Sequence, residues 1–151
     1  MPVAGIETWL GRLSIEETDG AITRIHWNEA GSQDKTPLLE EACDQLKAYL
    51  EGSLLTFDLP LRPKGGALHQ AVFQAMLDIP YGETRTYGDL AKDLNTYGQP
   101  IGQACGANPI PIVIPCHRIL SANGLGGYSG AGGLDTKIAL LKLEGGYPFL
   151  V

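Results

Sequence analysis

A run of prolines between residues 108 and 115 constrains the fold of this chain more than any other feature. The run reads Asn-Pro-Ile-Pro-Ile-Val-Ile-Pro and is followed at once by Cys116, His117 and Arg118. Proline lacks a backbone N–H and restricts the residue before it, so the run rules out a helix. We therefore predict an apolar, extended strand that ends at Cys116. Such a strand would fix the thiol in place, and a reactive thiol also needs a neighbour that can remove its proton.

The N-terminal part of the sequence has the pattern of a small α/β domain with an antiparallel sheet. Two loosely alternating stretches flank Asp19-Gly20, and this dipeptide between β-rich runs is typical of a hairpin turn. Farther along, apolar residues recur at spacings of three and four, which indicates a helix. We predict strands at 7–15, 21–27 and 54–59, a helix from Pro37 to Gly52, and a linker at 60–66.

The C-terminal part has the pattern of a mainly helical domain. Apolar spacing predicts helices at 68–77, 87–94, 99–106 and 134–143, with Thr86 capping the second and Gly145 ending the last. The second and third are short and are joined by a tight turn, as in a helix-turn-helix, although a plain helical hairpin has the same spacing. Residues 121–133 are predicted to form a loop. The fold class is therefore α+β, with domains at 1–66 and 67–151.

Cysteine usage and hydropathy indicate the cellular compartment in which the protein is expected to work. The chain has three cysteines, an odd number, and its beginning lacks the pattern of a signal peptide. The longest apolar stretch is interrupted by prolines and is far shorter than the ~20 residues of a membrane helix. We expect a cytoplasmic, monomeric protein that does not contact a membrane.

The net charge of −6 is unfavourable for a nucleic-acid partner, because phosphates are usually contacted from a basic surface. The acidity is uneven, however. Residues 1–66 hold 11 acidic and 6 basic side chains, whereas residues 67–151 hold 6 and 5. The nearly neutral C-terminal part could bind DNA through a few placed groups and helix N-termini, with a shallow salt dependence.

The twelve residues from Asn108 to Ile119 resemble the active-site signature of O6-alkylguanine-DNA alkyltransferases, in which a Pro-Cys-His-Arg core follows Asn-Pro and an apolar stretch. The resemblance runs from about Ala71 to Gly145, and the first 66 residues look only generally like the variable N-terminal domain of that family. Its other matching segments are 81–84, 86–88, 106–109, 127–130, 140–141 and 144–145.

The resemblance implies DNA repair by one irreversible alkyl transfer from O6-alkylguanine, and from O4-alkylthymine, to Cys116. His117 would act as general base through a bridging water, because its ring cannot reach the neighbouring sulfur directly. Glu144 would orient that ring, as in a hydrolase triad. We also expect His117 and Glu144 to lower the pKa of the thiol below its usual value of about 8.5.

The partner implied by the resemblance is double-stranded DNA carrying O6-alkylguanine, with the damaged base extruded from the stack. Asn108 would hold the turn before the active-site strand. Tyr87 would hydrogen-bond guanine N3 and turn the phosphate, and Ser129 would face guanine O6. The DNA- and substrate-binding residues implied are Gln99, Arg118, Tyr128, Ser129 and Gly130.

The sequence departs from the family pattern at Gln99. The family usually has an arginine there that enters the minor groove and fills the space left by the extruded base, and Pro100 replaces a small residue. The nearest cations, Arg85 and Lys92, lie at other places in the predicted helices. A second departure is the segment 129–137, which is slightly longer than in the shortest members.

We predict no metal and no cofactor. Some relatives carry zinc in the N-terminal domain, but His26, Cys43 and His69 are widely separated and form no closely spaced ligand pair. Cys105, on the predicted second helix of the helix-turn-helix, is interpreted as a small buried residue.

Two other functions are compatible with parts of the sequence. The first is a damage-binding protein that grips O6-alkylguanine without repairing it. Such proteins replace the nucleophile, whereas Cys116 is present here. The second is an unrelated cysteine hydrolase that uses Cys116 and His117, which would leave the helix-turn-helix pattern unexplained.

Overall fold

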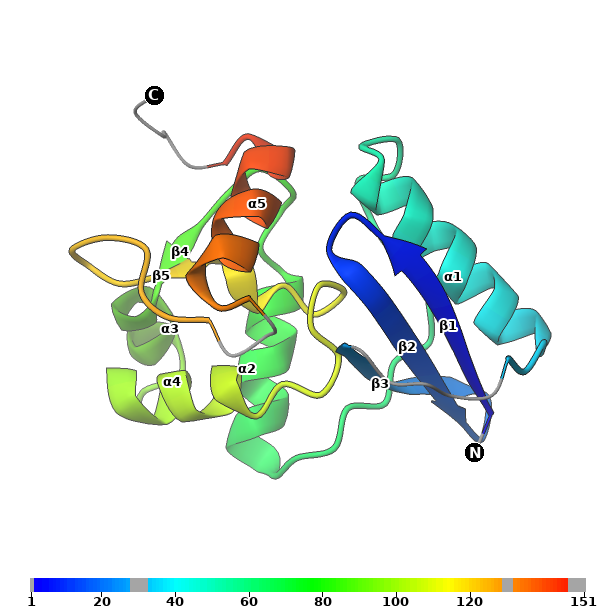
Figure 1. Ribbon diagram of the computed structural model, residues 1–151. Coiled ribbons are helices and arrows are strands. Elements are labelled where there is room, and N and C mark those ends of the chain that lie inside the picture. Colours follow the sequence, from blue (N-terminus) through cyan, green and yellow to red (C-terminus); the bar gives the residue numbers. More distant parts are fainter. Residues whose placement is uncertain (1, 28–32, 129–131, 147–151) are drawn as a thin grey trace. The chain divides into compact units, whose positions relative to one another are not determined.

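The computed structural model describes residues 2–27, 33–128 and 132–146, and the chain forms two compact units (Figure 1). The first unit spans Met1–Lys64 and the second Gly65–Val151, so the division lies within the predicted linker. The first holds an antiparallel sheet and a helix, and the second is mainly helical. The predicted α+β class is thus confirmed.

The first unit contains three antiparallel strands in the order β1-β2-β3, formed by Val3–Thr8, Gly11–Thr18 and Ala21–Trp27. The hairpin turn predicted between β2 and β3 is confirmed, and its residues Asp19 and Gly20 have φ of 49° and 79°. The single strand predicted at 7–15 was wrong. Thr8 Oγ1 accepts from Leu10 N at 3.0 Å and donates to Gly11 O at 2.7 Å, which closes a second turn between β1 and β2.

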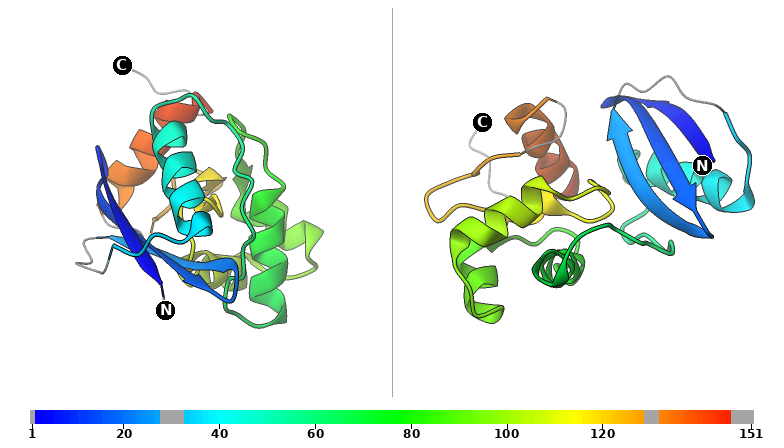
Figure 2. Two further views of the ribbon diagram at one scale, coloured as in Figure 1. Left: turned by 90° about the vertical axis from the view of Figure 1, so that its right-hand side faces the viewer. Right: turned by 90° about the horizontal axis from the view of Figure 1, so that it is seen from below.

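Helix α1, Pro37–Leu50, covers one face of this sheet, as the right-hand view of Figure 2 shows. It begins where predicted, because the Thr36 side chain accepts from Leu39 N at 3.1 Å and Pro37 needs no hydrogen-bond acceptor in the first turn. The strand predicted at 54–59 is absent from the described residues, and Leu61 instead forms an isolated bridge with Ile22 of β3.

Both edges of the sheet are hydrogen-bonded to neighbouring chain. On β1, the backbone of Val3 bonds with Asp34 through Asp34 N at 2.9 Å and Oδ2 at 2.9 Å. The Gln33 side chain accepts from Gly5 N at 3.2 Å and donates to Gly5 O at 3.1 Å. On β3, Ile22 bonds with Pro60 O and Arg62 N, each at 2.8 Å.

The second unit contains four helices, α2 (Ala67–Leu77), α3 (Tyr87–Asp93), α4 (Gly98–Gly106) and α5 (Leu134–Glu144), which confirms the helices predicted. Helix α4 packs against both α2 and α3 (Figure 1). Thr86 caps α3 as predicted, in a capping box with Asp89. No helix among the described residues is long and apolar enough to cross a membrane.

A two-residue parallel pairing between β4 and β5 was not predicted. Strand β4, Arg85–Thr86, directly precedes α3, and β5, Ile119–Leu120, directly follows the short 3-10 helix η1, Cys116–Arg118. The pairing therefore places the first residue of α3, Tyr87, beside the segment that contains Cys116.

Candidate active site

The proline run folds as a tight turn, and the strand predicted at this place was wrong. Asn108 closes the turn, because its Nδ2 donates to Ile114 O at 2.8 Å and its Oδ1 accepts from Ile110 N at 3.0 Å. Ile114 N also donates to Ile110 O at 2.9 Å, and Ile112 has a left-handed φ of 74°. As a result of this turn, Cys116 lies at the first position of η1. The role predicted for Asn108, to hold a turn, fits these contacts.

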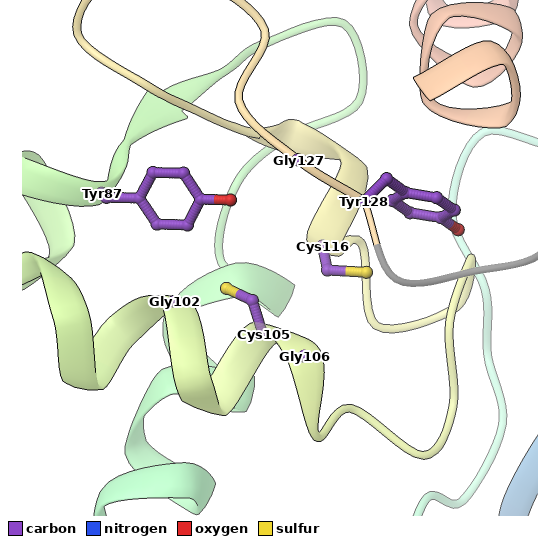
Figure 3. Close-up of a pocket in the computed structure, with 7 residues that line it drawn as sticks. All are labelled: Tyr87, Gly102, Cys105, Gly106, Cys116, Gly127 and Tyr128. Carbon is purple, nitrogen blue, oxygen red and sulfur yellow. The ribbon is translucent and has the colours of Figure 1, made fainter. Parts of the chain in front are cut away.

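Cys116 lies in a pocket of about 260 Å³ at the meeting of α3, α4, η1 and the loop after β5 (Figure 3). The Tyr87 hydroxyl and the Cys105 sulfur point into it. This volume is below the ~300–1,000 Å³ of pockets for drug-sized ligands, so it suits a small ligand. The pocket is lined by Tyr87, Gly102, Cys105, Gly106, Cys116, Gly127 and Tyr128.

The surroundings of Cys116 favour the protonated thiol at rest. Burial raises the pKa of Cys116, while a hydrogen bond from the Asn108 amide and the charge of Lys137 lower it. The expectation that His117 and Glu144 lower this pKa was wrong in direction and in the residues named. The physical reason is that burial removes the sulfur from water, while His117, whose own pKa is lowered by burial, is neutral and offers no positive charge to the thiolate.

The residue after Cys116 is His117, whose ring contacts Glu144 at the end of α5. His117 Nε2 lies 2.9 Å from Glu144 Oε2, and both side chains are almost fully buried. A carboxylate only accepts, so Nε2 carries the proton and donates it. In the neutral ring, Nδ1 then carries the lone pair that could take a proton.

His117 is held in the neutral form. Burial lowers its pKa below the usual 6.5, and the hydrogen bond and charge of Glu144 oppose this shift only in part. The charges of Arg118 and Lys137 lower the pKa further. A neutral imidazole can act as a base at neutral pH, whereas an imidazolium cannot.

The prediction that Arg118 binds DNA does not fit its position. Its side chain is buried and forms a two-point ion pair with Glu144, through Nε to Oε1 at 2.8 Å and Nη2 to Oε2 at 2.9 Å. Nη1 donates to Ile79 O at 2.6 Å, and the guanidinium lies 5.8 Å from the centre of the Tyr81 ring. Each of the three guanidinium nitrogens thus donates to a partner inside the protein, and the side chain is buried, so Arg118 is a structural residue of the site.

The remaining predicted residues fall into three groups. Tyr87 and Tyr128 line the pocket with Cys116 (Figure 3), and the Tyr128 hydroxyl is buried. Gln99 lies outside the pocket, exposed at the second residue of α4. Ser129 and Gly130 lie outside the described residues.

One residue of the site was missed from sequence, Lys137, and a second, Cys105, is buried as predicted and also lines the pocket. Lys137 of α5 is fully buried, and Cys105 lines the pocket with its pKa raised to about 12, mainly by burial. A lysine in a helix usually reads as a solvated residue. The available signal was its place seven residues before Glu144, which puts both on one face of a helix.

Among residues 2–27, 33–128 and 132–146, no cluster of three or more His, Cys, Asp or Glu side chains could hold a metal ion. His26 instead lies 2.9 Å from Glu16 within the sheet of the first unit.

Comparisons with known proteins match both parts of the chain to the same family. Residues 3–63 match the ribonuclease-like domain of 6-O-methylguanine DNA methyltransferase, and residues 67–146 match the DNA binding domain of the same family. A methylated-DNA–protein-cysteine methyltransferase of Methanosarcina acetivorans is 50% identical over 108 residues, which cover 70% of this chain and 68% of that protein. One of Mycobacterium tuberculosis is 40% identical over 148 residues, which cover 95% and 85%.

A solved structure has the same fold. The crystal structure of Mycobacterium tuberculosis OGT in complex with DNA has a TM-score of 0.85 and 38% sequence identity, over 95% of this chain and 92% of that one.

Proposed function

This chain belongs to the 6-O-methylguanine DNA methyltransferase family, and from that membership we propose that it repairs DNA by moving an alkyl group from guanine O6 to Cys116. The observation that carries the assignment to this residue is the placement of its thiol in a small pocket, with the next residue in the chain, His117, hydrogen-bonded to Glu144. O4-alkylthymine offers the same kind of alkyl–oxygen bond, and we include it as a second substrate.

The transfer is a displacement at the alkyl carbon. The Cys116 sulfur forms a bond to that carbon while the carbon–O6 bond breaks, and the electron pair of the broken bond goes to guanine. The thiol proton passes through a bridging water to His117, whose positive charge Glu144 then stabilises. The guanine takes up a proton and leaves as the normal base. A thioether resists hydrolysis, so each chain reacts once.

Tyr87 is placed to hold the extruded base. Its hydroxyl points into the pocket beside Cys116 (Figure 3), and its ring lies close to Gly126. A Cβ at Gly126 would lie 3.2 Å from the Tyr87 ring, so a side chain there would crowd it. In this position the hydroxyl can donate to guanine N3. The damaged base must leave the duplex to reach this pocket, because Cys116 is buried.

The DNA partner would contact the helix-turn-helix formed by α3 and α4. Helix α4 contributes Gly102, Cys105 and Gly106 to the pocket, so its exposed N-terminal end lies about one turn beyond the pocket rim. We propose that this end approaches the groove while the extruded base enters the pocket, and that a single copy of the chain does this.

The test is the intact mass of the protein after incubation with a duplex oligonucleotide containing O6-methylguanine. The mass should rise by one methyl group per chain, and peptide mapping should locate the methyl on Cys116. Cys116→Ser should gain none, whereas the matched variant Cys43→Ser, in the first unit, should react like the wild type. Multiple turnovers per chain contradict the proposal, and DNA binding without a mass change would support a damage-binding protein instead.

A further inference from the structure

Lys137 is a buried cation that the transfer chemistry described above does not use. Its side chain is fully buried on α5, two turns before Glu144. Removing an ammonium from water is costly unless hydrogen bonds and charges compensate. The position therefore needs a specific explanation, which its contacts supply.

The Lys137 ammonium joins two segments that form the site. Nζ donates to Ile119 O at 2.6 Å, three residues after Cys116, and to Gly127 O at 3.0 Å, on the pocket wall. The first carbonyl belongs to β5, and the second to the loop that follows β5. A Cβ at Gly126 would lie 3.6 Å from Nζ, so the ammonium also packs closely under this loop.

The ionisable groups around Lys137 are mainly thiols and phenols. The charges that couple to it are those of Cys116 on η1 and Cys105 on α4, with Tyr87 and Tyr128 on the same pocket wall. On its other side, its charge acts on His117, and Glu144 of its own helix is paired with Arg118. Within the described residues, no carboxylate forms an ion pair with Lys137. The anion that its charge can best balance is the thiolate of Cys116.

We propose that Lys137 is a positioning residue for alkyl transfer, which fixes the pocket wall and favours the thiolate of Cys116 with its positive charge. The proposal rests on the function proposed above. Lys137 keeps its own proton throughout, and the thiol proton still passes to His117. Burial lowers the pKa of Lys137 to about 8, so the charge is present at neutral pH and is lost in mildly alkaline solution.

The test compares Lys137→Met, which keeps the volume without the charge, with Lys137→Arg, which keeps the charge at every pH used. Lys142→Met removes an exposed lysine from the same helix and serves as the matched control. Two rates are measured from pH 6 to 10: alkylation of Cys116 by iodoacetamide, followed by peptide mass, and transfer from free O6-benzylguanine. Neither reaction needs DNA.

We expect Lys137→Met to raise the pKa at which Cys116 becomes reactive and to slow both reactions at pH 7 by about tenfold, the effect of one pKa unit. Above pH 8 both wild-type rates should rise less steeply than those of Lys137→Arg, because Lys137 loses its charge there while Arg keeps it, and Lys142→Met should match the wild type. Equal slowing at every pH with an unchanged thiol pKa would show a purely structural role and overturn the proposal.

Folding is checked by circular dichroism. If both Lys137 variants unfold, the wild-type iodoacetamide profile decides. A rate that rises less than tenfold per pH unit between pH 8 and 10 supports the proposal, because Lys137 loses its charge there, and a full tenfold rise per pH unit, as for a lone thiol, rejects it. If the wild type takes no benzyl group, the proposed function fails, while iodoacetamide reactivity still tests the influence of Lys137 on Cys116.

Discussion

Glu144 determines the state of the buried groups behind Cys116. It accepts a hydrogen bond from His117 and a two-point ion pair from Arg118. Because Arg118 already balances the carboxylate charge, His117 can stay neutral and ready to take a proton. A histidine paired with an unbalanced buried carboxylate would more readily become protonated.

Replacing Arg118 with Met should therefore lower both the stability of the fold and the rate of alkyl transfer. It leaves a buried carboxylate without its ion pair, which costs roughly 3–5 kcal/mol of unfolding free energy. It also raises the pKa of His117, since the charge of Arg118 lowers it. Urea unfolding checks the first effect, and a lower rate of transfer from O6-benzylguanine at pH 7 checks the second. Arg85→Met, at an exposed ion pair with Asp93, is the control and should cost under about 1 kcal/mol. Equal losses in the two variants would contradict this role of Arg118.

The lowered pKa of His117 also predicts how stability depends on pH. A group whose pKa is depressed by folding contributes stability above its unfolded pKa, here about 6.5, and loses it as pH falls through the folded value. The unfolding free energy of the wild type should thus fall more between pH 7 and pH 5 than that of His117→Gln, which has no titrating ring. Denaturant unfolding at both pH values measures this, and parallel losses would rule it out.

Elements whose signals are local could be predicted from the sequence, and those that depend on distant contacts could not. The spacing of apolar residues and the Thr86 cap define α1 to α5 within single segments. The prolines exclude a helix at 109–115, but only the bonds of Asn108 to both sides of that segment make it a turn. Arg118 and Lys137 read as surface cations for the same reason, since their partners Glu144 and Gly127 lie elsewhere in the sequence.

Helix α4 has no charged residue with which to hold DNA. Gln99 is exposed at its N-terminal end, and Arg85, the nearest possible substitute, is paired with Asp93 at 2.7 Å. Extruding a base from a duplex costs a few kcal/mol, which Gln99 can offset only weakly. Duplex repair should therefore be slow relative to reaction with the free base.

Gln99→Arg should accelerate repair of O6-methylguanine in duplex DNA. It should also steepen the dependence of DNA affinity on salt by roughly 0.9 in the log–log slope, the effect of one added phosphate contact. The rate with free O6-benzylguanine should stay the same, because no duplex is opened. Unchanged or slower duplex repair would mean either that Gln99 lies outside the minor groove or that it already fills the space left by the extruded base.

At the scale of the whole molecule, charge and chemistry are divided between the two units. The acidic excess belongs to the first, while residues 67–151 are almost neutral and contain the pocket, the helix-turn-helix and Lys137. A DNA partner is thus expected to be held by the second unit through shape and helix ends more than by net charge.

The partly covered edges of the three-stranded sheet have a consequence for a protein that is consumed by its own reaction. Each repaired lesion inactivates one chain, so the repair capacity of a cell equals its number of unreacted copies. Such a stock must remain dispersed, yet exposed strand edges are templates for aggregation. With Val3 and Gly5 bonded by Gln33 and Asp34, and Ile22 by its own neighbours, the sheet offers those groups to no second copy. Unreacted copies can then accumulate without aggregating through these groups.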